Sequence, residues 1–302
     1  MSGDDAVELR ELRQSQHGRW RNVVATVRRR LKEDRVNVAA GAFAYRWFLS
    51  IFPMIIALLG VATLLRLPRR VVLSLLHGVT AALPSGAARV FTEAIVHATS
   101  RSGQDLTATV LASAVALWSA VSGMVIMEEG LDMAYGIEGD RTFLAKRLVA
   151  LPLLLGGIVL GGGASALIVF GAALGTLIKD TLPFSAVAFA AVWNVARWIL
   201  ALVLINLQFS LLYYFAPNRA RPPWRWTSVG AVLGTGLWAL VSLAFSFYTS
   251  DFSSYAKTYG AFAGVAILIF WLFLTGYAIL VGGEVNAAIE RADIERAAVA
   301  TP

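Results

Sequence analysis

The sequence predicts an all-α integral membrane protein, built as a bundle of about six transmembrane helices. Of its 302 residues, 58% are hydrophobic and 15% are charged, whereas a soluble domain carries about 25% charged residues. The hydrophobic residues also form long uncharged stretches, each at least 19 residues long, and a helix needs about 20 residues to cross a bilayer. These stretches are 47–65, 106–127, 148–178, 198–218, 226–250 and 258–283. In lipid such segments must satisfy their own backbone hydrogen bonds, so we expect them to be helical.

The N-terminal region is polar and lacks the apolar core of a cleavable signal peptide. Residues 19–35 place apolar side chains at helical spacing, opposite a basic face. The apolar positions are Trp20, Val23, Val24, Val27 and Leu31, and the basic ones are Arg21, Arg28, Arg29 and Lys32. This pattern is typical of an interfacial helix on an anionic membrane surface. A solvated helix leading into the first span is the alternative interpretation.

Six spans follow, and they define the domain organisation. We expect them at 38–65, 106–127, 148–176, 187–215, 227–249 and 261–283. The chain is thus divided into a basic tail with the interfacial helix (1–36), a transmembrane domain (37–284) and a C-terminal tail (285–302). Between the first two spans, residues 71–100 form two short apolar stretches separated by a Pro-Ser-Gly break, each too short to span. We expect short helices there at the outer interface, with an ordinary external loop as the alternative.

The distribution of Lys and Arg predicts the orientation. With the N-terminus inside, the cytoplasmic segments carry 17 of these residues and the external segments carry 7. Basic residues concentrate on the cytoplasmic side of membrane proteins, so both termini are predicted to be cytoplasmic. The same distribution explains the net charge of +7 without a nucleic-acid partner.

Glycine spacing predicts close helix packing. Four pairs show the small-xxx-small spacing that lets helix backbones approach, within the chain or between copies in a homo-oligomer. They are Gly157 with Gly161, Gly171 with Gly175, Gly230 with Gly234, and Gly260 with Gly264.

One group of polar candidates lies on the first span. Arg46 is about eight residues into this span, and Ser50 and Pro53 fall on the same helical face. Proline lacks an N–H group, so Pro53 permits a kink at this point. An arginine at this depth is costly in lipid and therefore indicates a functional position.

A second group lies on the fourth span. Asn194, Arg197 and Gln208 lie within about 60° of one another around the helix, with Arg197 close to mid-membrane. Together with Arg46 they suggest a basic path or pocket that binds an anionic group.

A structural interpretation of the two arginines stays open beside this one. Each can pair with a carboxylate and join two helices, or extend to the interface. The available carboxylates are Glu128, Glu129, Asp132 and Glu284. Glu284 is the preferred partner of Arg46, since both lie toward the cytoplasmic side.

The sequence offers no catalytic constellation, so no enzyme activity, metal or cofactor is predicted. The three histidines, His17, His77 and His97, have no ligand-like spacing, and there is no cysteine. Phosphate-loop and dinucleotide-binding glycine patterns are also missing.

Three stretches resemble the YihY / virulence factor BrkB family of bacterial inner-membrane proteins. They are AAGAFAYRWFLSIFP at 39–53, EGLDMAYGIEGDRTFLAKR at 129–147, and YAKTYGAFAGVAILIFWLFLTGYAILVGGEVN at 255–286. The linking stretch LLYYFAPNRARPPWRW also fits. The matching motif positions outside the polar candidates are Tyr45, Pro53, Tyr135, Arg141, Tyr259, Gly260, Trp271 and Asn286.

The resemblance implies six membrane helices, an inner-membrane location and a role in envelope integrity. Some members have been proposed to move lipid-linked envelope material, and the family has also carried the label ribonuclease BN. We therefore expect a transporter or flippase-like exporter of an amphiphilic anionic envelope molecule, in contact with membrane lipids. The candidate substrate-binding residues are Arg46, Ser50, Asn194, Arg197, Gln208 and Glu284. A scaffold for envelope assembly is the alternative, and ribonuclease activity is not expected because no residue set could activate water against phosphate.

Overall fold

The computed structural model describes residues 20–64, 106–179, 186–219, 226–250 and 261–300, although the side chains of 51–64 and of some other helical residues lie outside this description. The expected segment 71–100 also lies outside it. Residues 20–33 are helical, and a turn at residues 34–35 connects them to the next helix. The named helices are α2 (Val36–Leu64), α5 (Leu106–Tyr135), α6 (Phe143–Lys179), α7 (Ala186–Phe215), α8 (Val229–Ser250) and α10 (Ala261–Ala300).

The all-helical membrane fold is confirmed. All regular secondary structure in the described residues is helical, and each predicted span falls on one helix. Within the described residues, four helices are long and apolar enough to cross a membrane: Phe143–Ile168, Phe189–Phe215, Val229–Tyr248 and Gly264–Arg296. Six crossings stay a prediction.

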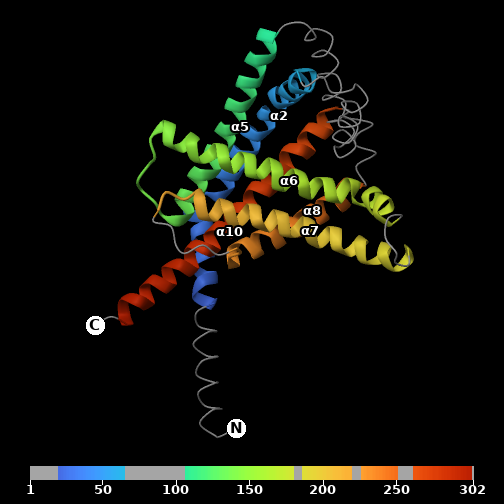
Figure 1. The fold of residues 1–302 in the computed structure, drawn as a ribbon. Helices are drawn as coiled ribbons and strands as arrows, with labels where there is room; N and C mark the ends of the chain where they lie inside the picture. The colour runs from blue at the N-terminus through green and yellow to red at the C-terminus, as the bar shows by residue number, and fades with distance from the viewer. Residues whose placement is uncertain (1–19, 65–105, 180–185, 220–225, 251–260, 301–302) are drawn as a thin grey trace.

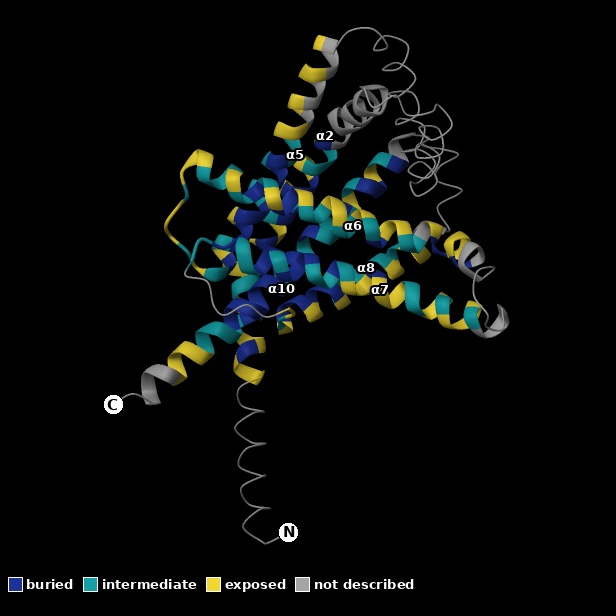
Figure 2. Cartoon of the chain, in the orientation of Figure 1, coloured by how far each residue is buried: buried dark blue, intermediate teal, exposed yellow. Residues whose placement is uncertain are grey.

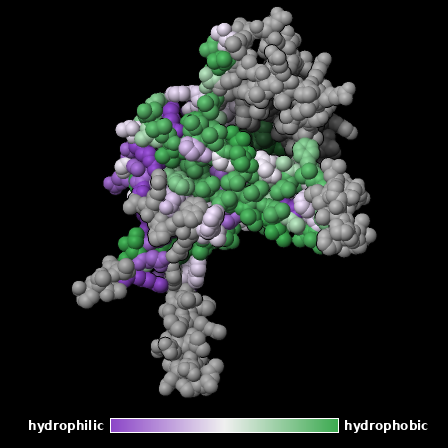
Figure 3. Space-filling model, in the orientation of Figure 1, coloured by the Kyte–Doolittle hydropathy of each residue, from purple (hydrophilic) through white to green (hydrophobic). Residues whose placement is uncertain are grey.

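These helices direct much of their apolar surface outward. In the most apolar 18-residue stretch of α6, only 17% of the residues are buried inside the protein, compared with 44% in the corresponding stretch of α10. A soluble protein would bury such apolar stretches, whereas in a membrane they face lipid. Figure 2 shows exposed residues along α6 and α7 and buried ones along α10, and Figure 3 shows the hydrophobic surface on this face. α10 is therefore the central helix of the bundle.

The described helices form three antiparallel pairs, α2 with α5, α6 with α7, and α8 with α10 (Figure 1). In the pair of α2 and α5, Trp47 lies against Gly123, and Ser50 lies against Ser119. In the pair of α8 and α10, the indole of Trp271 donates to Ser242 at 3.2 Å. α10 also packs on α2 and α5, so it connects two of the pairs.

Glycines in α6 make room for large side chains of α7. A Cβ atom on Gly171 would lie 2.8 Å from Cδ of Arg197, and one on Gly157 would lie 3.3 Å from Nε2 of Gln208. Trp193 packs over Gly175. The predicted packing role is therefore confirmed for Gly157, Gly171 and Gly175, whereas Gly161 has no described atom within 4 Å of an added Cβ.

The N-terminal helix packs partly on α10. Val23 and Val27 are buried against Val285 and Ala288, while Trp20 and Val24 stay exposed, so its position at the membrane interface stays a prediction. α10 itself continues through the predicted domain boundary at residue 284. The N-terminal helix and the end of α10 thus form one packed unit.

Candidate functional site

Charged and polar side chains gather at one end of the bundle, which we name the polar end. It comprises the turn at 34–35, the end of α5 with the following loop to 147, residues 216–219 after α7, and residues 284–291 of α10. The backbone at the end of α5 brings the loop back toward the bundle. Gly136 has φ +67°, and the amides of Gly136 and Ile137 donate to the carbonyls of Met133 and Asp132. This is a Schellman motif, in which glycine is favoured because the left-handed conformation carries no Cβ penalty.

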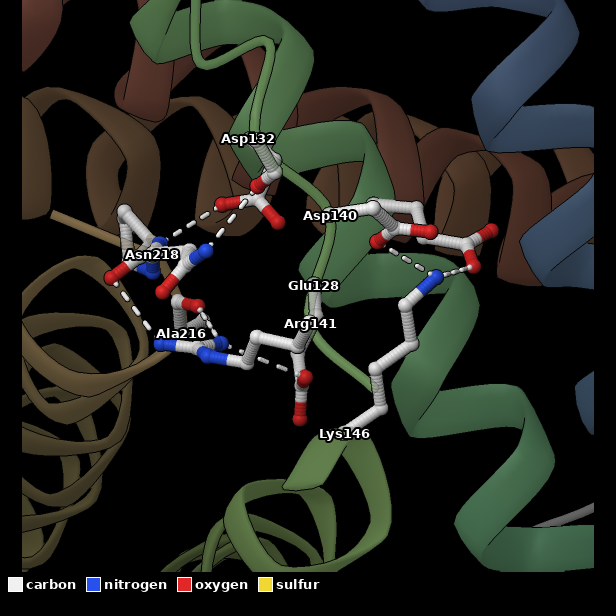
Figure 4. A network of polar contacts seen from close by, with 10 residues as sticks. Glu128, Asp132, Asp140, Arg141, Lys146, Ala216 and Asn218 are labelled. Atoms are coloured by element: carbon white, nitrogen blue, oxygen red, sulfur yellow. Dashed lines mark hydrogen bonds and ion pairs between the residues drawn. The ribbon is translucent and has the colours of Figure 1, made fainter. Parts of the chain in front are cut away.

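Arg141, at the end of this loop, binds the C-terminal end of α7 (Figure 4). Its guanidinium donates to the carbonyl oxygens of Ala216 at 2.6 Å and Pro217 at 3.2 Å. It also lies 3.5 Å from the carboxylate of Glu128, whose side chain is 1% exposed. These four residues form the Arg141 cluster. A fixed cation just beyond the C-terminal end of a helix also interacts favourably with the helix dipole.

Two further contacts hold the same loop in place (Figure 4). Lys146 forms ion pairs with Glu129 at 2.6 Å and with Asp140 at 2.8 Å. Asp132 accepts a hydrogen bond from the backbone N–H of Asn218 at 2.7 Å, and the side-chain amide of Asn218 donates to the carbonyl of Gly139 at 2.9 Å. These polar contacts therefore connect the loop to α5, and connect both of them to the segment that follows α7.

Burial alters the acid–base properties of this region. Glu128 and Asp132 both lie on the part of α5 beyond the predicted span 106–127. Desolvation raises the pKa of Glu128 to about 8, against the opposing effect of Arg141, and it also raises the pKa of Asp132. With a pKa of about 8, the Glu128 carboxyl group is largely protonated at neutral pH.

Glu284 lies in a second polar group of the same end. Its side chain is 1% exposed, and it lies near Asp34, Arg291 and Arg30. Arg291 donates to the carbonyl of Ala134 at 2.9 Å. These contacts connect the N-terminal helix, α5 and α10.

The predicted pair of Arg46 and Glu284 is wrong. Arg46 is exposed, and in the described chain it forms no ion pair with any carboxylate. Ser50 is buried, donates to the carbonyl of Arg46 at 2.8 Å and lies 3.1 Å from the hydroxyl of Ser119. Ser50 therefore joins α2 to α5, and Glu284 lies beside the turn that follows the N-terminal helix instead.

The predicted group on α7 separates into three environments. Asn194 is exposed, Arg197 is half-buried beside Gly171, and Gln208 is buried and donates to the carbonyl of Leu153 at 3.2 Å. Since α2 packs on α5 and α10 while α7 packs on α6 and α8, the structure does not assemble Arg46 and Arg197 into one pocket.

The family-motif residues have several structural positions. Asn286 accepts from the amide of Gly230 at 2.8 Å and donates to the hydroxyl of Ser228 at 2.8 Å. Ser228 accepts from the amide of Ala231, so Asn286 completes the cap of α8. The guanidinium of Arg219 lies 4.4 Å from the centre of the Tyr135 ring.

The remaining motif residues are more scattered. Tyr45 is exposed, and Trp271 packs edge-on against Trp238 on α8. Pro53 lies within α2, in the part whose side chains are not described, and Tyr259 and Gly260 lie outside the described residues.

Sequence reasoning did not identify the partners of Arg141. Ala216 and Pro217 contribute through carbonyl oxygens, which leave no trace in side-chain patterns. Asn218 stands directly after Pro217, and this Pro-Asn pair at the end of an apolar run is a turn signal that could have drawn attention to it. Within the described residues, no three His, Cys, Asp or Glu side chains are grouped so that they could hold a metal ion.

Comparison with known proteins gives consistent matches along most of the chain. The family model named virulence factor BrkB matches residues 27–301. The putative ribonuclease-like protein YfkH of Bacillus subtilis is 36% identical over 250 residues, which cover 82% of this chain and 88% of that protein. A UPF0761 membrane protein of Vibrio campbellii is 27% identical over 262 residues, covering 86% and 80% of the two chains. A UPF0761 membrane protein of Vibrio cholerae is 28% identical over 261 residues, covering 86% and 84%. No solved structure shows significant similarity.

Proposed function

The chain belongs to the virulence factor BrkB family of membrane proteins, and from this premise we propose that it is a transporter of the flippase type. Its substrate in this proposal is an amphiphilic anionic molecule of the cell envelope. We place the protein in a bacterial cytoplasmic membrane with both termini on the cytoplasmic side, on the basis of its Lys and Arg distribution.

One observation carries the proposal: two arginines within predicted spans form no ion pair with any of the described residues. Among the described residues, neither Arg46 nor Arg197 forms an ion pair with a carboxylate. The Nε atom of Arg197 is buried and has no hydrogen-bond acceptor among these residues. A guanidinium at membrane depth is costly, and an anionic headgroup would offset that cost by accepting its hydrogen bonds.

The positions of these arginines favour a route along the boundary between protein and lipid. Arg46 is exposed on α2, and Arg197 is half-buried at the contact of α6 and α7, with its guanidinium 5.8 Å from the Trp198 ring. In this mechanism the acyl chains of the substrate stay in the lipid, while the anionic headgroup contacts one arginine and then the other. Such a route needs no single internal pocket.

Reconstitution into liposomes tests the proposal. A fluorescent anionic phospholipid is incorporated into both leaflets, and reduction of the outer-leaflet dye reports whether the inner-leaflet population becomes accessible. We expect faster exchange than in protein-free liposomes, and a loss of most of this rate in Arg197→Gln, which keeps a side chain over Gly171.

Arg197→Lys is the matched control, because it retains the charge and should retain part of the rate. Asn194→Ala changes an exposed neighbour on the same helix and should have little effect. An unchanged rate in the Arg46→Gln/Arg197→Gln double variant, with the protein still folded, would reject this site.

A scaffold for envelope assembly is the second candidate, and a separate observation favours it. In the part of the chain that the structure describes, no atom lies within 4 Å of a Cβ added to Gly161 or Gly162, so α6 presents an open small-residue surface there. A second copy or another membrane helix could pack there. Liposomes that show no lipid exchange, together with loss of an oligomer in Gly161→Leu, would favour the scaffold.

We do not propose nuclease activity, although one relative carries a ribonuclease-like name. The transport proposal rests on the positions of the two arginines and on the membrane-embedded fold. Such a fold places most side chains out of reach of RNA. Cleavage of RNA by the purified protein, abolished by a single substitution at the polar end, would contradict it.

A further inference from the structure

A groove lies between the N-terminal helix and the last turns of α10, outside the transport residues proposed above. It has a volume of about 570 Å³. Its walls come from both helices and include Asn22, Thr26, Arg29, Arg30, Arg291 and Arg296. We propose that this basic groove binds the phosphate group of an anionic membrane lipid, as a site separate from any transport route.

Packing of small apolar residues explains why the groove exists. Val23 and Val27 are buried against Val285 and Ala288, which fixes the two helices at one edge. Ala288 and Ala292 line the groove, and their short side chains leave the space beside this contact unfilled. The long arginine side chains then extend around a space that the protein itself does not fill.

The charges around this space favour an anion. Four arginines line it, and Glu295 is the one carboxylate among the lining residues. Arg29 and Arg30 pair with Glu33 and Asp34, but each of these contacts is long, with N to O distances of 3.7 Å.

The arginines retain donors that no described residue uses. The Nε atom of Arg30 is buried and has no acceptor in the described part of the chain. Arg296 forms no ion pair within the described chain, and Arg291 directs one nitrogen to the carbonyl of Ala134. A phosphate group can accept several of these hydrogen bonds at once, because guanidinium groups match its geometry.

The adjacent face of the N-terminal helix indicates that the phosphate comes from a lipid. Trp20 and Val24 are 45% and 63% exposed, beside Arg21, Arg28 and Lys32. An exposed tryptophan next to basic residues is typical of a helix at the headgroup level of an anionic membrane. A helix in that position places the groove within reach of lipid phosphates.

The test uses the purified full-length protein in detergent, with phosphatidylglycerol and phosphatidylcholine titrated separately and bound lipid counted by native mass spectrometry. We expect preferential binding of phosphatidylglycerol. Each arginine that donates a charge-assisted hydrogen bond to the phosphate contributes about a tenfold change in affinity, so Arg29→Gln/Arg296→Gln should weaken this binding about 100-fold.

The matched control is Arg21→Gln/Arg28→Gln, which removes the same charge from the other side of the N-terminal helix. The control variant should bind phosphatidylglycerol with an affinity within about twofold of the unmodified protein. Its substituted arginines lie outside the groove, and solvent and salt screen their effect on a lipid bound there. Both variants change exposed residues, so both should keep the thermal stability of the parent protein.

Three results would overturn the inference. Equal losses in the two double variants would show that overall positive charge, rather than the groove, attracts the lipid. Glycerol 3-phosphate competing as well as phosphatidylglycerol would assign the groove to a soluble phosphate compound. An RNA oligonucleotide that binds the parent protein and loses binding in Arg29→Gln/Arg296→Gln would assign it to nucleic acid.

Discussion

Substitution of Arg141 should destabilise the protein mainly through lost contacts to the end of α7. In Arg141→Gln the guanidinium that donates to Ala216 at 2.6 Å and to Pro217 at 3.2 Å is removed. A hydrogen bond to a charged group contributes about 1.5 kcal/mol, so the two together correspond to about 3 kcal/mol. The partner Glu128 contributes less at pH 7, since its raised pKa of about 8 keeps it largely protonated.

Because the hydrogen bonds of Arg141 contribute more than its contact with Glu128, substitution of Arg141 should destabilise the protein more than substitution of Glu128. Arg141→Gln should lower the free energy of unfolding by about 3 kcal/mol, which is about 5 °C in melting temperature for a chain of this size. Glu128→Gln, which mimics the protonated carboxyl group, should lower it by less than about 1 kcal/mol at pH 7. The double variant should resemble Arg141→Gln alone.

The melting temperatures of the variants can be ranked by heating the purified protein in one detergent and following its unfolding by size-exclusion chromatography. Arg21→Gln serves as the control for loss of a positive charge at an exposed position. If Glu128→Gln destabilised the protein as strongly as Arg141→Gln, the ion pair rather than the contacts to the helix end would be the main contribution. That result would refute the assignment of the stabilisation to the carbonyls of Ala216 and Pro217.

Three further outcomes follow from the same structure. Because burial raises the pKa of Glu128 from 4.5 to about 8, the melting temperature should fall as pH rises through that interval, and it should fall less in Glu128→Gln. Gly136→Ala should lower stability by about 1 kcal/mol in thermal unfolding, because Gly136 has positive φ, whereas Gly139→Ala, with open space around it, should be nearly neutral. Asn286→Ala should cost about 1 kcal/mol in the same assay through loss of the α8 cap, and Asn286→Asp should recover part of it by keeping the acceptor.

The helix positions could be predicted because lipid imposes a strong local rule. A segment of about 20 apolar residues must be helical in a membrane, whatever its neighbours are. The packing role of the α6 glycines could be predicted for a similar reason. Small residues on one helix are enough to allow a neighbouring helix to approach closely, so the signal is visible in that helix alone. Gly157 and Gly171 fulfil this expectation by accommodating Gln208 and Arg197.

The partners of polar residues could not be predicted in the same way, because they depend on which helices become neighbours. Arg46 and Glu284 were paired on the basis of depth alone, yet α2 turns Arg46 outward while Glu284 lies beside Asp34. Asn194 and Gln208 share a stripe on an ideal helix, but only Gln208 reaches α6. Uniformly apolar spans carry little periodicity, so the sequence leaves their rotation undetermined.

The central place of α10 has a consequence for biogenesis. This helix is synthesised after α2, α5 and α8, and yet it packs against all three. The surfaces of α2, α5 and α8 that contact α10 therefore stay unfilled until the ribosome has released the last helix. A quality-control protease that recognises such exposed intramembrane surfaces would thus find the growing chain vulnerable until its final stage, and chains interrupted before α10 should be degraded rather than accumulate.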